Sequence, residues 1–269
     1  MRRKTIRSIK KFLFHFLLNK GVKTSPTTAP ERLQKFLKLV KPYTTNHELV
    51  RVGGNADGGY LIPDDLEGIT ACFSPGVENT ATFETDMARR GIKSFMADYS
   101  VDAAPVKSPL FSFEKKYLGT ESNEVYTRLS TWMNRCAPDQ SDFILQMDIE
   151  GAEYGVILDT PESELAKFRI MVIEFHYVDE LCNHFGFEFI NLAFQKLLKQ
   201  FEIVHVHPNN SNKPFNFHGF DLFHAMEITF LRKDRVVGKV LTTSFPHPLD
   251  QKCVPDKPDY ALPACWYGN

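Results

Sequence analysis

Acidic and histidine side chains follow directly on hydrophobic runs that have the length and composition of buried strands. Four of them stand out: Asp148, Glu174, His176 and His207. In an open α/β sheet, ligands bind beyond the carboxyl ends of the strands, so these side chains are expected to meet at one edge. Ionised groups gathered there repel one another and lose solvation unless a cation or a proton lies among them. The pattern therefore predicts a reactive or ion-binding site.

Two kinds of chemistry suit this set of side chains. All four could be ligands of a divalent cation, with the carboxylates favouring Mg²⁺ and the imidazoles tilting the choice toward Mn²⁺. Alternatively the site is free of metal, and His176 or His207 acts as a general base for a hydroxyl substrate while hydrogen bonds orient the acids. In either case Asp148, at the end of the run 143–147, is expected at the reaction centre.

The loop after an earlier hydrophobic run could hold a cofactor. Residues 69–73 lead into Ser74-Pro75-Gly76-Val77-Glu78-Asn79, where Gly76 would let a ligand approach the backbone closely. Asp98, about 20 residues farther on, is placed to accept hydrogen bonds from both hydroxyls of a ribose. The chain has neither GxGxxG nor GxxxxGK[ST], so a diphosphate cradle is poorly supported. An adenosine ligand without a diphosphate, such as S-adenosylmethionine, fits these features.

The elements that must position these residues alternate between strand-like and helix-like segments. Strands are expected at 69–73, 93–97, 143–147, 170–175, 203–207 and 227–232, and helices at 82–90, 129–135, 152–158 and 189–200. This alternation is typical of an α/β fold with a doubly wound, mostly parallel sheet that ends in an antiparallel edge pair. Residues 49–62 precede it, and their glycine-rich centre predicts a β-hairpin. Residues 236–241 are a candidate extension of the last strand.

The ends of the chain differ in composition from its centre. Three segments are expected: residues 1–47 with a basic amphipathic helix, a linker and a short helix; residues 48–245 as the catalytic domain; and residues 246–269 as a Pro-rich wrap. The basic helix, 5–19, could lie on an anionic membrane surface, which would give peripheral membrane contact through residues 1–20. The alternative is a helix packed on the domain or on a partner, with its basic face in water.

Bulk composition argues against several classes of protein. The net charge of −1 does not suit a nucleic-acid-binding protein. The five cysteines have no CxxC spacing, which disfavours a zinc ribbon or a disulfide scaffold and favours a reducing, cytoplasmic location. No apolar stretch approaches the ~20 residues that a membrane-spanning helix needs, and no signal-peptide cleavage pattern follows the first helix.

Five blocks of residues resemble the FkbM-like branch of the S-adenosylmethionine methyltransferases. The blocks are Asp57-Gly58-Gly59-Tyr60, the loop 74–79 with Phe83-Glu84, Met147-Asp148-Ile149-Glu150-Gly151-Ala152-Glu153, Glu174-Phe175-His176 and His207-Pro208-Asn209-Asn210. The resemblance covers residues 49–245 and implies a Rossmann-like class I methyltransferase with a seven-stranded sheet. It also implies O-methylation of a sugar hydroxyl on a glycan or glycoconjugate. The turn Ser74-Pro75-Gly76 is poorer in glycine than the turn common in methyltransferases.

The resemblance also implies roles for individual residues. The cofactor-binding residues would be Asp57, Ser74, Gly76, Glu78, Asn79, Asp98, Ser100 and Asp148. Loop 74–79 would line the methionine and adenosine pocket, Asp98 would bind the ribose, and Asp148 would face the methyl-transfer centre. Asp57 would close the pocket from the hairpin, although its position also suits a simple turn. Glu153, at a predicted helix start, suits capping as well as catalysis.

Two other functions are compatible with the residues. Acids at the strand ends could hold a metal and a nucleotide diphosphate, as in a nucleotide-sugar-using glycosyltransferase, but Asp98-Tyr99-Ser100 lacks acid–x–acid spacing. A non-catalytic glycan-binding domain is the other alternative, since Asn209 and Asn210 suit sugar hydroxyls. The aromatic and basic run 111–117 is either a solvated sheet edge or a lip for glycan or phosphate groups.

Overall fold

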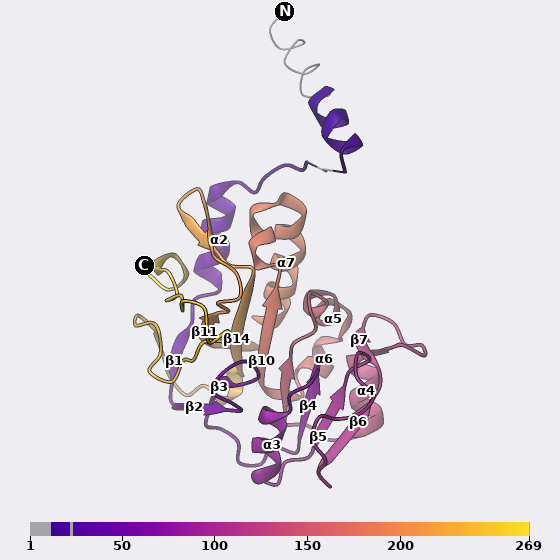
Figure 1. Ribbon diagram of the computed structural model, residues 1–269. Helices are drawn as coiled ribbons and strands as arrows, with labels where there is room; N and C mark the ends of the chain where they lie inside the picture. Colours follow the sequence, from indigo (N-terminus) through magenta and orange to yellow (C-terminus); the bar gives the residue numbers. More distant parts are fainter. Residues whose placement is uncertain (1–11, 22–23, 269) are drawn as a thin grey trace, which may run out of the picture.

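A seven-stranded sheet forms the centre of the computed structural model, which describes residues 12–21 and 24–268 (Figure 1). Its strands are β4 (Ala71–Pro75), β5 (Ser94–Ala97), β6 (Phe111–Glu114), β9 (Phe143–Met147), β10 (Phe168–His176), β11 (Phe201–Pro208) and β14 (Ala225–Arg232). Across the sheet the order is β11-β14-β10-β9-β4-β5-β6. The first five strands in chain order are parallel, whereas β14 runs antiparallel to both β10 and β11. This Rossmann-like arrangement confirms the expected mostly parallel α/β fold with antiparallel pairing at one edge.

Different elements cover the two faces of the sheet. The α-helices between residues 24 and 268 are α2 (Pro30–Leu39), α3 (Thr82–Arg89), α4 (Leu129–Cys136), α5 (Glu153–Asp159), α6 (Glu162–Leu165) and α7 (His184–Leu197). Side chains of α2, α4, α5 and α7 form one core cluster with Phe73 and Phe175 of the sheet. A second cluster joins the sheet to α3 and to the predicted hairpin, which consists of β2 (Leu49–Val52) and β3 (Tyr60–Pro63). The hairpin thus covers part of a face that helices would otherwise cover.

Strand β10 contributes side chains both to the hydrophobic core and to the polar group at the end of the sheet. Ile173 and Phe175 belong to the helix-covered core, while Val172 belongs to the cluster beneath the hairpin. Because successive side chains of a strand point to opposite faces, Glu174 and His176 continue the row that faces the hairpin. The polar residues at the end of β10 therefore lie on the hairpin side of the sheet.

Several short elements differ from the sequence-based expectation. Residues 239–241 form β15 (Lys239–Leu241) and pair with β1 (Tyr43–Thr45), so they do not extend β14. The run 111–117 supplies the edge strand β6 and the start of β7 (Tyr117–Gly119), which pairs in parallel with β8 (Tyr126–Arg128). Helix α7 begins earlier than expected because the side chain of Asn183 accepts a hydrogen bond from Phe185 N and caps it. The other short elements are β12 (Phe215–Phe217), β13 (Phe220–Leu222), and the 3₁₀ helices η1 (Val178–Cys182), η2 (Lys233–Arg235) and η3 (Ala264–Trp266).

The N-terminal segment is described only in part. Residues 12–19 are helical, but the rest of the expected basic helix lies outside the described residues. The expected membrane contact through residues 1–20 therefore falls largely outside them and stays a prediction. In the described part of the chain, no helix combines the length and the apolar character needed to cross a bilayer.

The Pro-rich tail is anchored along its length, as expected for a wrap. The side-chain amide of Asn210 donates to the carbonyls of Val254 (2.9 Å) and Pro258 (3.2 Å), and its oxygen accepts from Val254 N (2.8 Å). Farther on, Trp266 is 1% exposed and donates its indole N–H to the carbonyl of Asp221 (2.9 Å). The tail is therefore part of the folded domain, although it adds no strand to the sheet.

Phe73→Ala should lower the free energy of unfolding by about 3–5 kcal/mol, because the buried ring packs against four other aromatic rings. Phe185→Ala is the matched control, since this ring is 64% exposed and its loss should change the free energy by no more than about 0.5 kcal/mol. Denaturant titration of both variants measures the difference. Equal losses in the two variants would contradict this assignment of the core.

Candidate functional site

A cavity of about 400 Å³ opens at the carboxyl ends of β4, β5 and β9, where ligands bind in sheets of this kind. We call it the strand-end cleft; its lining residues are Gly76, Glu78, Ala97, Asp98, Ser100, Tyr117, Leu118, Tyr126, Asp148, Ile149, Glu150 and Ala152. A smaller cavity of about 50 Å³ extends it toward the hairpin, sharing Gly76, Glu78 and Asp148 and adding Asp57. The volume of the cleft lies within the range of about 300–1,000 Å³ that is usual for small-molecule sites.

Two tyrosines contribute to the wall of the cleft, and the sequence singled out Tyr117 but not Tyr126. Tyr117 and Tyr126 lie on β7 and β8, and their ring centroids are 5.9 Å apart. Tyr99 extends the group, with its ring centroid 5.4 Å from that of Tyr117. Tyr117 was visible as the end of the aromatic run 111–117, but its proximity to Tyr126 depends on pairing between two three-residue strands. No local pattern predicts such a pairing.

Gly76 is required for a contact within the chain. Its φ is +85°, a left-handed conformation that favours glycine. A Cβ at this position would lie 1.5 Å from the main-chain oxygen of Asp148. The loop after β4 therefore packs directly on the loop after β9. Gly76 does line the cleft, but the close approach that demands a glycine is to Asp148 rather than to a ligand.

Asp98 lies in the cleft with its carboxylate already oriented. Its Oδ2 accepts from the main-chain N–H of Glu78 (2.8 Å), and its Oδ1 accepts from the N–H (2.8 Å) and the hydroxyl (2.7 Å) of Ser100. Glu78 has a φ of +42°, which turns the loop back so that its amide reaches Asp98. Ser100 thus positions the carboxylate, and an acceptor direction on Oδ2 is left for a ligand hydroxyl.

Two residues expected to line the cofactor pocket lie elsewhere. The side chain of Ser74 is buried within β4, where its hydroxyl pairs with Glu84 and lies 2.5 Å from Oε1 of Gln146. Burial raises the pKa of Glu84, which favours a protonated carboxyl in this network. Asn79 lies beyond the turn of the loop, is exposed, and lines a separate surface hollow with Arg89. Neither residue lines the strand-end cleft or its extension.

Three carboxylates meet at the inner end of the cleft. Asp57, Asp148 and Glu174 each place an oxygen within 4.8 Å of the others, and we call them the acid cluster. Oδ1 of Asp148 and Oε2 of Glu174 are buried and have no hydrogen-bond partner among the described residues. The other oxygen of Glu174 accepts from Asn209 Nδ2 at 2.6 Å. A hard divalent cation such as Mg²⁺ or Mn²⁺ suits this oxygen-only set, and Asp57 is a ligand that the sequence-based metal set omitted.

Burial governs the protonation of the acid cluster. It raises the pKa of Asp148 to about 9, and the neighbouring charge of Glu174 adds to the effect. Burial also raises the pKa of Glu174 well above its ordinary value, with the charge of Glu227 the next cause. The cluster therefore favours bound protons near neutral pH, and a divalent cation would reverse this preference by stabilising the ionised carboxylates.

His176 reaches the acid cluster from the end of β10. Its Nε2 lies 3.5 Å from a carboxylate oxygen of Glu150, 3.8 Å from one of Glu174 and 3.9 Å from one of Asp148. Its Nδ1 lies 3.2 Å from Oε1 of Glu153. Burial lowers the pKa of His176, but the hydrogen bond to Glu153 and the surrounding negative charges outweigh burial, so the pKa is raised overall. The structure therefore brings His176 together with Asp148 and Glu174, as expected.

Glu153 holds the loop that follows β9. Its Oε1 accepts from the main-chain N–H groups of Ile149 (3.2 Å) and Gly151 (3.0 Å) while it also faces His176. The side chain is fully buried and does not line the cleft. Of the two roles open from the sequence, capping the backbone fits Glu153 better than catalysis, and the same contact orients His176.

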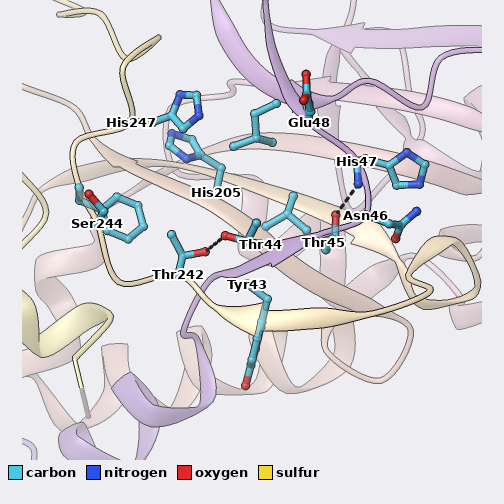
Figure 2. A pocket seen from close by; sticks show the side chains of 13 residues that line it. Tyr43, Thr44, Thr45, Asn46, His47, Glu48, His205, Thr242, Ser244 and His247 are labelled. Carbon is cyan, nitrogen blue, oxygen red and sulfur yellow. Dashed lines mark hydrogen bonds between the residues drawn. The ribbon is translucent and has the colours of Figure 1, made fainter.

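A larger cavity of about 450 Å³ lies between β1, β11 and the tail (Figure 2). The hydroxyls of Thr44 and Thr242 are 2.9 Å apart in its wall, and three histidines also line it: His47, His205 and His247. None of its described lining residues lines the strand-end cleft or the extension. This cavity is larger than the strand-end cleft but lacks its group of acidic side chains. We therefore take the strand-end cleft as the candidate functional site.

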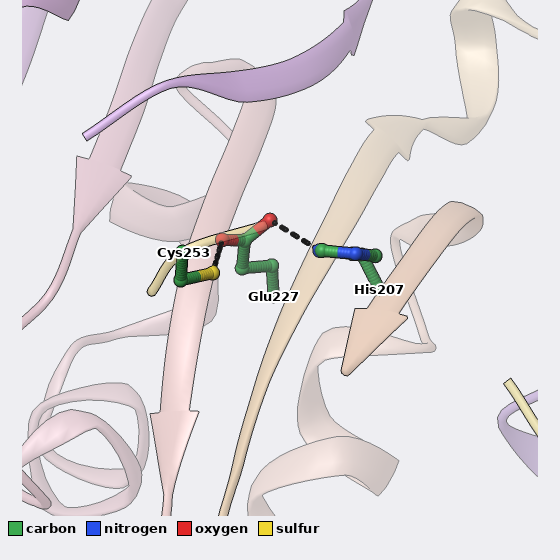
Figure 3. A group of neighbouring side chains, drawn as sticks. All are labelled: His207, Glu227 and Cys253. Atoms are coloured by element: carbon green, nitrogen blue, oxygen red, sulfur yellow. Dashed lines mark hydrogen bonds and ion pairs between the residues drawn. The ribbon is translucent and has the colours of Figure 1, made fainter. Parts of the chain in front are cut away.

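His207 belongs to a second cluster. Its Nδ1 lies 3.2 Å from Oε2 of Glu227, and Cys253 Sγ donates to Oε1 of Glu227 at 3.0 Å (Figure 3). Burial lowers the pKa of His207, but the hydrogen bond and charge of Glu227 dominate and raise it to about 9. Glu227 stands opposite both Glu174 and His207 in the register of the sheet, so strand β14 separates His207 from β10. His207 was predicted to bind a metal or act in catalysis together with Asp148. The structure instead places it with Glu227 and Cys253.

No protein-family model matches the chain, and a search of the curated proteins finds no similar sequence. The likeness to FkbM-like methyltransferases therefore rests on the residue blocks themselves and stays a prediction.

Asp148→Asn should raise the free energy of unfolding at pH 8, with a chelator present, by about 1–3 kcal/mol. The unfolded carboxyl ionises near pH 4 and the folded one near pH 9, so the wild type loses stability as the pH rises between these values. Asparagine removes this titration, and the two proteins should converge near pH 4. Denaturant titrations at pH 5 and pH 8 test this.

Asp102→Asn serves as the control for this pH dependence, because the Asp102 side chain is 92% exposed. It should show no comparable gain at pH 8. A gain in Asp148→Asn that does not grow with pH would contradict the burial of an ionisable carboxyl at this position.

Proposed function

We propose that the chain is an S-adenosylmethionine-dependent O-methyltransferase that acts on a sugar hydroxyl of a glycan or glycoconjugate. The observation that carries the proposal is the charge of the strand-end cleft and its extension. Six acids line them: Asp57, Glu78, Glu84, Asp98, Asp148 and Glu150. No Lys or Arg is among the described lining residues. Such a lining offers nothing to neutralise a diphosphate, whereas a cationic ligand such as a sulfonium cofactor would favour the ionised form of Asp148 and its neighbours.

The parts of adenosine have matching groups in the cleft. Leu118 and Ile149 offer apolar surface to the base, and the ring of Tyr117 or Tyr126 could stack on it. Asp98 would accept a hydrogen bond from a ribose hydroxyl. When bound, S-adenosylmethionine supplies a methyl group on a positively charged sulfur. When it is ionised and holds no metal, the acid cluster would stabilise that charge from the inner end of the cleft.

The residues at the inner end could also activate the acceptor. A sugar hydroxyl is a poor nucleophile at neutral pH, so it needs a base or a cation that depresses its pKa. Asp148 in its ionised form, and His176 in its neutral form oriented by Glu153, are the candidate proton acceptors. Asp57, Asp148 and Glu174 would hold a divalent cation, which would polarise a coordinated hydroxyl. Alignment of that hydroxyl with the methyl group is the other requirement on the cleft.

The two alternative functions have weaker support. A nucleotide-sugar glycosyltransferase must neutralise a diphosphate, and a cation on the acid cluster is the one means that the described lining residues offer. A non-catalytic glycan-binding domain has no use for buried carboxylate oxygens without hydrogen-bond partners, such as those of Asp148 and Glu174. Burying such groups is unfavourable, so their presence favours chemistry or ion binding over passive binding of a neutral sugar.

The proposed setting follows from other features of the chain. All five cysteines are free, which supports a reducing compartment such as the cytoplasm. The acidic cleft would repel nucleic-acid phosphates, which disfavours a nucleic-acid acceptor and is compatible with the proposed glycan. Contact of residues 1–20 with an anionic membrane would bring the enzyme to lipid-linked glycans, and this part of the proposal rests on the sequence.

Asp98→Ala should weaken the binding of S-adenosylhomocysteine at least about 10-fold, because a ribose hydroxyl loses its acceptor. Asp102→Ala, at an exposed position nearby in sequence, should bind as the wild type does. Asp148→Asn should bind the cofactor product yet fail to transfer a labelled methyl group to a panel of glycans. Calorimetry gives the affinities. Normal affinity in Asp98→Ala would contradict the role of Asp98 in cofactor binding. Near-normal transfer by Asp148→Asn would contradict the role of Asp148 at the reaction centre.

Mn²⁺ should bind the acid cluster of the wild type, and Glu174→Gln should weaken that binding about 10-fold or more, because it removes one ligand charge. Glu162→Gln is the matched control, since the Glu162 side chain is 47% exposed and lines neither the cleft nor its extension. Electron paramagnetic resonance of free Mn²⁺ measures the affinity. Equal affinity in both variants would argue for the metal-free form of the site.

A further inference from the structure

We infer that His207, Glu227 and Cys253 form a binding site for a zinc-type cation, separate from the acid cluster (Figure 3). The three side chains come from β11, β14 and the Pro-rich tail. All three residues are buried, and each offers one ligand atom within 4.8 Å of the other two. This inference goes beyond the proposed methyl transfer and does not depend on it.

The spacing of the donor atoms is close to that of a tetrahedral site. Zinc bonds of about 2.0 Å to nitrogen or oxygen and 2.3 Å to sulfur place neighbouring ligand atoms about 3.3–3.6 Å apart. Here His207 Nδ1 lies 3.2 Å from one oxygen of Glu227, and Cys253 Sγ lies 3.0 Å from the other. His207 and Cys253 contact different oxygens of Glu227, so the carboxylate would turn one oxygen toward a cation that all three residues bind. Three protein ligands leave the fourth position to a water molecule.

The surroundings of His207 also fit a metal ligand. Its Nε2 is buried and has no hydrogen-bond partner in the described part of the chain, but it faces Oδ1 of Asp259 at 3.8 Å. Histidines that bind a metal through one nitrogen commonly direct the other N–H at a carboxylate, which fixes the tautomer. Asp259 is therefore placed to orient His207 with Nδ1 toward the cation.

The buried carboxylate of Glu227 requires a positively charged partner, and the described residues compensate its charge only in part. It stands opposite Glu174 in the β10–β14 ladder, and both carboxylates are buried. His207 is its one ion-pair partner among the described residues. The nearby guanidinium of Arg51 instead donates to the carbonyls of Gly54 and Ala56. A cation held with Cys253 as thiolate would compensate Glu227, which forms no ion pair with a Lys or Arg among the described residues.

The donor set selects the class of metal. A thiolate and an imidazole favour Zn²⁺ or a similar transition metal over Mg²⁺, whereas the acid cluster has oxygen ligands only. A cation at this second site would join the tail to two strands of the sheet through Cys253. A bound metal would therefore fix residues near 253 against β11 and β14.

Titration of the metal-free full chain with Co²⁺ tests the site, because a thiolate ligand produces a charge-transfer band in the near ultraviolet. The band should saturate at one equivalent and disappear when Zn²⁺ is added. Cys253→Ser should abolish it, whereas Cys265→Ser, at a half-buried free cysteine, should keep it. Asp259→Asn should weaken Co²⁺ binding about 10-fold and keep the band, as loss of an outer-shell partner does.

Two results would overturn the inference. One is a wild-type protein that is folded by circular dichroism yet gives no thiolate band, which would leave the three side chains as a metal-free hydrogen-bonded group. The other is a band that survives Cys253→Ser. Mn²⁺ bound at the acid cluster has no sulfur ligand, so success or failure there does not affect this readout.

Discussion

Buried carboxylates crowd the carboxyl edge of the sheet, and the chemistry of the site follows from how the chain compensates their charge. Partly buried Asp148 lies just beyond β9, and buried Glu174 and Glu227 lie near the ends of β10 and β14; the three strands are neighbours in the sheet. None of them forms an ion pair with Lys or Arg within the described residues. An isolated carboxylate in such a place would be strongly disfavoured, so a proton or a cation must share the edge.

Strand β14 divides that edge into two halves with different donors. On the side of the cleft, Asp57 adds a third carboxylate and the ligands are all oxygen. On the side of the tail, His207 and Cys253 surround Glu227 with nitrogen and sulfur. The fold thus places hard and softer candidate ligand sets toward the two sides of β14, the antiparallel strand of the seven-stranded sheet. The arrangement keeps the proposed cofactor cleft apart from the proposed metal site at the tail.

The positions of the strand ends could be predicted because hydrophobic runs and side-chain alternation are visible within a few consecutive residues. The hydrophobic run before Asp148 is visible in the sequence, and the carboxyl-end rule then places Glu174 at the same edge. Partners from distant segments have no such signal: Asp57 arrives through the folding of the hairpin, and Cys253 arrives through the path of the tail. Ser74 shows a further limit, because a residue next to a predicted loop can lie inside the strand and pair with a helix.

The anchoring of the tail has a consequence for folding during synthesis. Residues that close over the β11–β14 end of the sheet, from the carbonyls held by Asn210 to the buried indole of Trp266, come late in the chain. During synthesis the parallel half of the sheet leaves the ribosome long before them. Until residues 253–266 emerge, the apolar surface that Trp266 covers stays open to water. The nascent chain would then expose this apolar surface to chaperones until residues 253–266 emerge and dock on the sheet.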